Sequence, residues 1–322
     1  MPSASELPFL QLGLLDADIT FCNLVLSKIN GLKLRRLAKS TLMTVREALA
    51  EGRIAMKLQG NSTPELDTAL LLANACKLDR EQLYMRLSES LDSTIVKKYR
   101  LATRRRISGE PVAWIIGRKE FWGRNISVGP GVFCPRPDTE ALIEVALKTM
   151  DEYTPEARLH DCCCGPGTLA LTLAAERPGW SISASDISPI AEKYFEKNNL
   201  AISNGKVKYF HSNLLKNVPG NFEVIVSNPP YLTPAEFSQQ KKWKEPALAL
   251  NGGDHDGLKI IRRLIPHAWA KTTNNGALLL EVSPTQMDRI FKLLTDTGFK
   301  NIQYHKDLGG SPRVAIAKKE AI

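Results

Sequence analysis

The tetrapeptide Asn228-Pro229-Pro230-Tyr231 is the strongest chemical signal in the chain, and it follows an apolar segment over residues 222–227. Two consecutive prolines remove backbone donors and restrict φ, so the turn is stiff. The Asn228 side-chain oxygen and the Pro229 carbonyl can each accept one N–H of a planar NH2 group, and the Tyr231 ring can lie against its flat face. The motif therefore predicts a site for reaction at an amide or ring nitrogen. The alternative is a plain turn that ends a strand.

A second candidate site is the segment from Asp161 to Gly167, which reads DCCCGPG. Gly165 and Gly167 permit positive φ and a close approach of the backbone to a ligand. No Gly-Lys-Ser/Thr follows, so the loop is not a phosphate-binding P-loop. Asp186 ends the next expected strand, where a carboxylate can bind both hydroxyls of a ribose. Asn213 ends the strand after that and can bind an adenine amino group, although the two-glycine loop alone is also typical of a tight turn.

The second half of the chain alternates between expected strands and helices. We expect strands over 158–164, 180–185, 207–210, 222–227, 277–282, 302–305 and 313–317, and helices over 168–176, 189–199, 258–271 and 284–297. Such alternation predicts a mostly parallel sheet with helices on both faces. The last two strands have only a loop between them, so they should pair antiparallel. In such sheets, ligands bind outside the carboxyl ends of the strands.

The chain before these strands is expected to be helical over 43–106, with helices beginning at Thr63, whose side chain can accept backbone N–H groups, at Asp79 and near Asp92. The third helix ends in a basic cluster that is either a solvated face or an RNA or ribosome contact: Lys97, Lys98, Arg100, Arg104, Arg105 and Arg106. Short extended segments are expected at 120–122, 126–128 and 132–133, with a turn at 129–131.

Composition sets broad limits on the function. The chain has 322 residues, with 43 Lys and Arg against 34 Asp and Glu, a surplus that favours anionic partners or simply solubility. Its six cysteines, three of them adjacent, suit neither a disulfide framework nor a zinc site, so we expect reduced thiols and no metal. No basic segment precedes an apolar run at the start, and no run could span a bilayer, so we expect a cytoplasmic protein.

Together these motifs resemble the HemK/PrmC-type protein glutamine methyltransferases. Besides the tetrapeptide and the glycine loop, the resemblance rests on Glu120–Gly123 (EFWG), Pro135–Glu140 (PRPDTE), Glu245–Gly253 (EPALALNGG) and the ending Asp307, Gly310 and Arg313. It implies an α/β fold of class I S-adenosylmethionine-dependent methyltransferases, Rossmann-like with a mostly parallel seven-stranded sheet, and an N-terminal helical domain. The implied reaction transfers methyl from S-adenosylmethionine to the side-chain N5 of the Gly-Gly-Gln glutamine in class I peptide release factors.

The resemblance also assigns roles to residues. The substrate-binding motif of the family falls on Asn228, Pro229, Pro230 and Tyr231. The implied cofactor-binding residues are Asp161, Cys163, Cys164, Gly165, Pro166, Gly167, Asp186, Asn213, Leu214 and Asn228.

Three positions depart from the family pattern, in which Cys163 is a glycine, Asn213 an Asp and Leu214 an aromatic residue. A positive φ at Cys163 would store about 1–2 kcal/mol of strain. We therefore expect an active enzyme with reduced cofactor affinity.

The expected organisation is an extension of unassigned role at 1–42, a helical substrate-recognition domain at 43–118, a β-hairpin linker at 119–134 and the catalytic domain at 135–322. We expect a monomer whose partner is a class I release factor, with no membrane contact and only indirect contact with nucleic acid. Three alternatives remain: methylation of a glutamine in a large-subunit ribosomal protein, methylation of DNA adenine at N6, and a non-catalytic binding protein.

Overall fold

The computed structural model describes residues 42–239 and 244–321. The chain divides into two compact units, with the boundary between Ile107 and Ser108. The predicted extension at 1–42 lies outside the described residues except for Leu42, and so does Cys22. Within the two described ranges, no helix is both long and apolar enough to cross a membrane.

The first unit is helical, as predicted. Its described helices are α2 (Val45–Leu58), α3 (Pro64–Cys76), α4 (Arg80–Met85) and α5 (Ser93–Ile107). Asp79 begins α4 as expected, because its carboxylate accepts the Gln82 N–H at 2.7 Å. The prediction that Thr63 accepts N–H groups at the start of α3 is wrong. Its hydroxyl instead donates to Asp67 Oδ1 at 3.0 Å, because the carboxylate is a strong acceptor one turn away.

The second unit begins with a short helix and a hairpin: α6 (Val112–Ile116), β1 (Arg118–Phe121) and β2 (Arg124–Ser127). β1 and β2 pair antiparallel around Trp122 and Gly123, whose φ angles of 51° and 69° are typical of a type I′ turn. The prediction of an extended segment at 132–133 is wrong, since this stretch is irregular. It is held by the Trp114 indole N–H, which donates to the Val132 carbonyl at 3.1 Å.

A seven-stranded sheet forms the centre of the second unit, which confirms the predicted fold class. Its strands are β3 (Arg158–Cys162), β4 (Ser181–Asp186), β5 (Lys208–His211), β6 (Phe222–Ser227), β7 (Thr272–Glu281), β8 (Lys300–Lys306) and β9 (Pro312–Lys318). The spatial order is β5-β4-β3-β6-β7-β9-β8. All neighbours are parallel except that β9 runs antiparallel to both β7 and β8.

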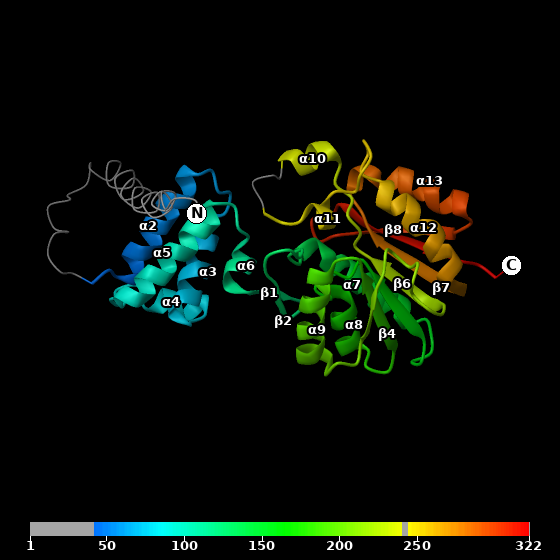
Figure 1. Ribbon diagram of the computed structural model, residues 1–322, viewed down its shortest axis with the longest axis horizontal. Helices are drawn as coiled ribbons and strands as arrows, with labels where there is room; N and C mark the ends of the chain where they lie inside the picture. Colours follow the sequence, from blue (N-terminus) through cyan, green and yellow to red (C-terminus); the bar gives the residue numbers. More distant parts are fainter. Residues whose placement is uncertain (1–41, 240–243, 322) are drawn as a thin grey trace, which may run out of the picture. The chain divides into compact units, whose positions relative to one another are not determined.

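Helices cover both faces of this sheet (Figure 1). The helices are α7 (Glu140–Met150), α8 (Thr168–Glu176), α9 (Pro189–Ser203), α12 (Lys259–Lys271) and α13 (Met287–Thr297). Successive residues of a strand point to opposite faces. In β6, Val224 and Val226 therefore pack in the core under α7, α8 and α9, while Ile225 packs under α12 and α13. Both faces are apolar, as a sheet covered on two sides requires.

Four short elements connect these layers near the carboxyl ends of the strands: η2 (Pro137–Thr139), α10 (Pro234–Gln239), α11 (Ala247–Leu250) and η4 (Pro284–Gln286). The strand order changes direction between β3 and β6, which are adjacent although β4 and β5 lie between them in the chain. Crevices for ligands open at such a switch point.

Candidate cofactor and substrate site

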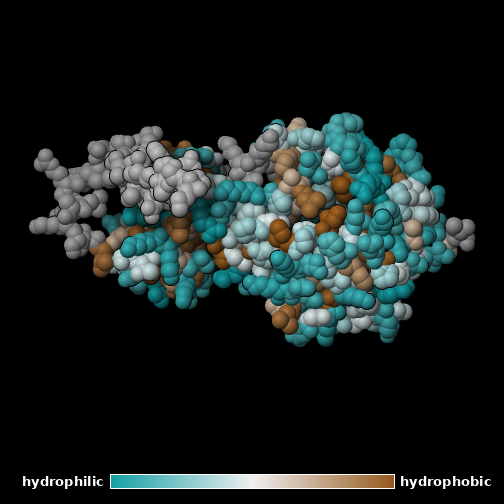
Figure 2. Space-filling model, in the orientation of Figure 1, coloured by the Kyte–Doolittle hydropathy of each residue, from teal (hydrophilic) through white to brown (hydrophobic). Residues whose placement is uncertain are grey.

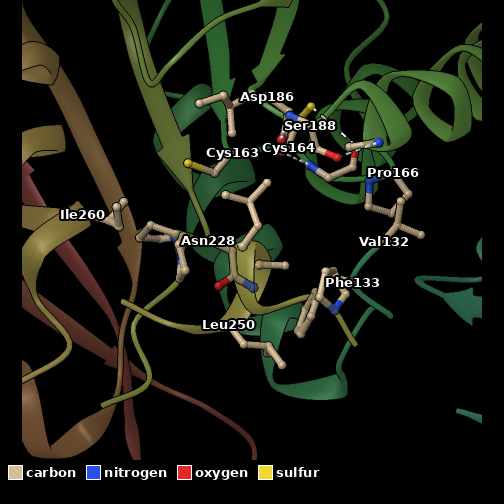
Figure 3. Close-up of a pocket in the computed structure, with 18 of the residues that line it drawn as sticks. Val132, Phe133, Cys163, Cys164, Pro166, Asp186, Ser188, Asn228, Leu250 and Ile260 are labelled. Atoms are coloured by element: carbon tan, nitrogen blue, oxygen red, sulfur yellow. Dashed lines mark hydrogen bonds between the residues drawn. The ribbon is translucent and has the colours of Figure 1, made fainter. Parts of the chain in front are cut away.

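A cavity of about 750 Å³ opens at the carboxyl ends of β3, β4 and β6. This volume lies within the range of about 300–1,000 Å³ typical of small-molecule sites. Most of the predicted site residues line it: Cys163, Cys164, Gly165, Pro166, Asp186, Asn213, Leu214, Asn228, Pro229, Pro230 and Tyr231. The site therefore brings the glycine loop and the Asn-Pro-Pro-Tyr corner together around one space (Figure 3).

The loop after β3 supplies a backbone surface that a nucleoside can approach. Gly165 has a φ of 54°, and a Cβ built there would have no heavy atom within 4 Å, so the space in front of it is open. Its N–H donates to Asp186 Oδ2 at 2.9 Å, and Asp186 Oδ1 accepts the Ser188 N–H at 2.8 Å. Burial raises the pKa of Asp186. Figure 3 shows Asp186 and Ser188 beside Cys164, across the cavity from Leu250 and Phe133. This cradle fits a ribose-containing cofactor.

Asp161 and Gly167 lie behind the cavity wall and do not line it. Asp161 is fully buried, its Oδ2 accepts the Ala170 N–H at 3.0 Å, and burial raises its pKa. A Cβ at Gly167 would lie 2.7 Å from the Leu171 and Phe195 side chains. Asp161 and Gly167 therefore support the conformation of the loop from its buried side.

The three departures from the family pattern have visible consequences. Cys163 has a φ of 63°, so this residue with a Cβ is held in the left-handed region and its backbone is strained. Leu214 has a φ of 55° and is buried, so it lies under the cavity as an apolar floor. Asn213 Oδ1 accepts a hydrogen bond from the Arg263 guanidinium at 3.1 Å. Of the five described cysteines, all are free thiols, and Cys163 is the one that lines the cavity while remaining partly accessible.

The Asn-Pro-Pro-Tyr corner is fixed through both of its polar side chains. Asn228 Nδ2 donates to Thr139 Oγ1 at 3.3 Å, and the Tyr231 hydroxyl donates to Glu281 Oε1 at 3.3 Å. Burial raises the pKa of Tyr231, so its hydroxyl keeps its proton. Because the Asn228 nitrogen is engaged with Thr139, its side-chain oxygen remains available to a ligand.

The backbone that follows the corner is held just as tightly. Gln286 Nε2 donates to the Tyr231 carbonyl at 2.8 Å, and the Leu232 N–H donates to the Leu250 carbonyl at 2.9 Å. Gly252 and Gly257 permit this close packing, since a Cβ at Gly257 would lie 2.4 Å from the Tyr231 carbonyl oxygen. The stiffness expected from the two prolines is therefore reinforced by neighbouring segments.

Buried Glu245 links the segment after the hairpin to the segment before α11. Its Oε1 accepts the Cys134 N–H at 2.9 Å, and its Oε2 pairs with the Arg136 guanidinium. Leu248 of α11 lies at the cavity and is 56% exposed, so the rim is apolar. Figure 2 shows apolar residues gathered near α11 on a face that is otherwise largely hydrophilic. Such a rim suits a protein segment as the second ligand.

Sequence reasoning missed several residues of this site. Thr139 and Glu281 contact the corner directly, and Phe133, Ile187 and Arg263 line the cavity. Glu281 carried a usable signal, because a carboxylate directly after the apolar run Ala277–Leu280 must lie at the carboxyl end of a buried strand. Within residues 42–239 and 244–321, the cavity included, no group of three His, Cys, Asp or Glu side chains could hold a metal ion.

Comparisons with known proteins identify the family. Residues 47–117 match the PrmC N-terminal domain, and residues 124–244 match the methyltransferase small domain. The release factor glutamine methyltransferase of Coxiella burnetii is 36% identical over 80% of this chain and 93% of its own length. That of Koribacter versatilis is 35% identical over 86% of this chain and 99% of its own length. That of Neisseria gonorrhoeae is 35% identical over 79% of this chain and 93% of its own length. The chain thus belongs to the release factor glutamine methyltransferase family, whose methyl donor is S-adenosylmethionine.

Proposed function

We propose that this enzyme methylates the side-chain N5 of a protein glutamine, and that its substrate is the Gly-Gly-Gln glutamine of a class I peptide release factor. The family membership supports the reaction, and the names of the relatives support the substrate. The observation that carries the proposal is the orientation of Asn228, whose nitrogen is bound to Thr139 so that its oxygen is free to accept an N–H. As a protein of translation, the release factor would be met in the cytoplasm.

The corner can hold an amide NH2 group by both of its hydrogens. Asn228 Oδ1 accepts one N–H and the Pro229 carbonyl accepts the other, so the nitrogen is fixed and its lone pair can turn out of the amide plane. The Tyr231 ring lies against the flat face, with its hydroxyl bound to Glu281. Well-aligned positioning of this kind can supply up to roughly 7–11 kcal/mol of the barrier reduction.

The cofactor would be held by the other side of the cavity. Asp186 would bind the ribose hydroxyls, Gly165 would allow close backbone contact, and Asn213 and Leu214 would lie on the adenine side. S-adenosylmethionine supplies an electrophilic methyl group on a sulfonium when bound. We assign no general base, because charge disperses during the transfer and the proton can leave to water afterwards. The helical unit, which matches the PrmC N-terminal domain, would recognise the protein substrate.

The test is methyl transfer from labelled S-adenosylmethionine to three substrates, offered separately: a release factor, ribosomal proteins and DNA. We expect label in the release factor at the Gly-Gly-Gln glutamine. A release factor with Glu at that position should be refused, because the acceptors at Asn228 and Pro229 would be left unpaired. Label confined to ribosomal protein would move the substrate assignment, and label confined to DNA would overturn the reaction itself.

A further inference from the structure

Arg263 places a cation at the edge of the cofactor cavity, and the proposed reaction gives it no role. It follows Ile260 by about one turn of α12, and both residues line the cavity, where Figure 3 shows Ile260. The neighbouring Arg262 pairs with Asp256, whereas Arg263 has no carboxylate partner within residues 42–239 and 244–321. Its guanidinium instead donates to Asn213 Oδ1 at 3.1 Å.

Asn213 lies where the base of the cofactor is expected. In the sheet, His211 pairs with Asp186, and the Ser212 N–H donates to the Asp186 carbonyl at 3.0 Å. Asn213 is therefore close to the carboxylate assigned to the ribose, and it lines the cavity beside the apolar floor at Leu214. A base attached to a ribose at Asp186 would present its polar edge to Asn213.

The contact with Arg263 fixes the orientation of the Asn213 amide. The oxygen and nitrogen of an amide have nearly the same shape, so the hydrogen bonds that they make must distinguish them. A guanidinium carries only donors, so the atom that it contacts must be the amide oxygen. The Asn213 NH2 group, which can only donate, is then the part of the side chain without a partner among the described residues.

This orientation determines which atoms of a base the site can recognise. The ring nitrogens beside the amino group of adenine accept hydrogen bonds, whereas the amino group donates them. The Asn213 NH2 group can therefore bind a ring nitrogen but not the amino group. The Asn213 oxygen keeps a second lone pair, but it lies beside the positive guanidinium, which repels the amino hydrogens.

We propose that Arg263 is a specificity-determining residue for the cofactor. By holding the Asn213 oxygen, it makes the site recognise the base through a ring nitrogen and not through its amino group. The inference replaces the expectation that Asn213 binds the adenine amino group, and it rests on the cofactor roles given under the proposed function.

Calorimetry with S-adenosylhomocysteine tests this inference, because the demethylated cofactor carries the same nucleoside and transfers nothing. In wild-type enzyme, an analogue with hydrogen in place of the 6-amino group should bind within about threefold of the parent compound. Of two analogues with CH in place of N1 or N7, one should bind roughly threefold to tenfold more weakly, as expected for one lost hydrogen bond. A larger loss with the deamino analogue, or full affinity for both CH analogues, would overturn the proposal.

Two variants should create the missing preference for the amino group. Arg263→Met keeps an apolar stem and removes the donors, so the Asn213 amide can turn its oxygen toward the base. Asn213→Asp keeps an oxygen for Arg263 and puts a second oxygen in place of the NH2 group. Each variant should bind the parent compound roughly threefold to tenfold more tightly than the deamino analogue. A merely structural role of Arg263 would change the affinity for both compounds alike.

The matched control is Lys216→Met, which removes a nearby exposed cation that bonds no described residue of the cavity. It should bind the two compounds as wild type does. An Arg263→Met enzyme that shows no preference for the amino group would remove Arg263 from this role. The wild-type comparison needs no variant, so it stays decisive if Arg263→Met does not fold.

These measurements can be separated from the choice of substrate. Binding of S-adenosylhomocysteine without methylation of a release factor would refute the substrate proposal and leave this inference standing. Binding with a clear preference for the amino group would refute this inference alone. No binding of any of these compounds at millimolar concentration would overturn the cofactor roles and this inference together.

Discussion

Replacing Cys163 by glycine should stabilise the protein, because Cys163 is held at a φ of 63° in the loop after β3. The left-handed conformation disfavours a residue with a Cβ by about 1–2 kcal/mol. Glycine relieves that strain but also gives the unfolded chain more freedom, which offsets about 0.4–1 kcal/mol. The net gain in the free energy of unfolding should therefore be about 1 kcal/mol.

The matched control is Cys163→Ala, which removes the thiol and keeps the Cβ. Urea denaturation of both variants, with equal m-values, isolates the backbone contribution, because the lost sulfur is common to both. The strain is already present in the free protein, so it should appear in stability and not in cofactor binding. Calorimetry should give the two variants equal affinity for S-adenosylmethionine.

Equal stability of the glycine and alanine variants would refute the strain argument. A higher affinity in the glycine variant, with unchanged stability, would show instead that the free loop avoids the left-handed conformation and adopts it on binding. That result would restore the expectation that this cysteine reduces cofactor affinity.

Three other predictions concern the site. Asn228→Ala should lower turnover at least about a hundredfold through lost positioning while calorimetry still detects cofactor binding, and near-normal turnover would remove Asn228 from its role. Asp186→Asn should weaken cofactor binding about tenfold or more, because one carboxylate oxygen becomes an NH2 donor that faces the N–H of Gly165 or Ser188. The surface variant Asp151→Asn should leave cofactor binding unchanged. Burial raises the pKa of Glu281 from its ordinary value of 4.5, expected in the unfolded chain, to about 7 in the folded protein. The folded protein therefore binds more protons between these pH values, and it loses stability as the pH rises through them. The free energy of unfolding of Glu281→Gln minus that of wild type should therefore increase from pH 5 to pH 8, by up to about 3 kcal/mol. A difference that is the same at both pH values would contradict the raised pKa.

Much of the fold could be predicted from periodicity and turn residues. The alternation of apolar strands and amphipathic helices is a local pattern, and it led to the observed mostly parallel sheet with an antiparallel end. The boundaries were less accurate, since β7 begins at Thr272 and not at Ala277. Polar residues at its start carry no strand signal, and pairing with β6 extends the strand there.

The parts of the site that lie on a single loop were predictable, and the parts joined across the fold were not. Asn228 and Gly165 follow strands directly, so their place at the carboxyl edge could be inferred from order alone. Thr139 is distant from Asn228 in the chain, and their contact depends on how α7 docks on the sheet. Short helices such as α6 and α11 also escaped prediction, because a single turn has too few residues to show a period.

The insertion of β9 between β7 and β8 has a consequence for the order of assembly during synthesis. β8 leaves the ribosome before β9, yet β9 is its only neighbour among the described strands of the sheet. Residues 300–306 must therefore wait, unpaired, until residues 312–318 enter the gap, and the edge of β7 is open for the same interval. Glu281 pairs with Val314 across that edge, so the catalytic corner can reach its final form only when the last strand has emerged. A nascent chain that stalls before residue 312 would carry a helical unit and a cofactor loop but an unfinished substrate site.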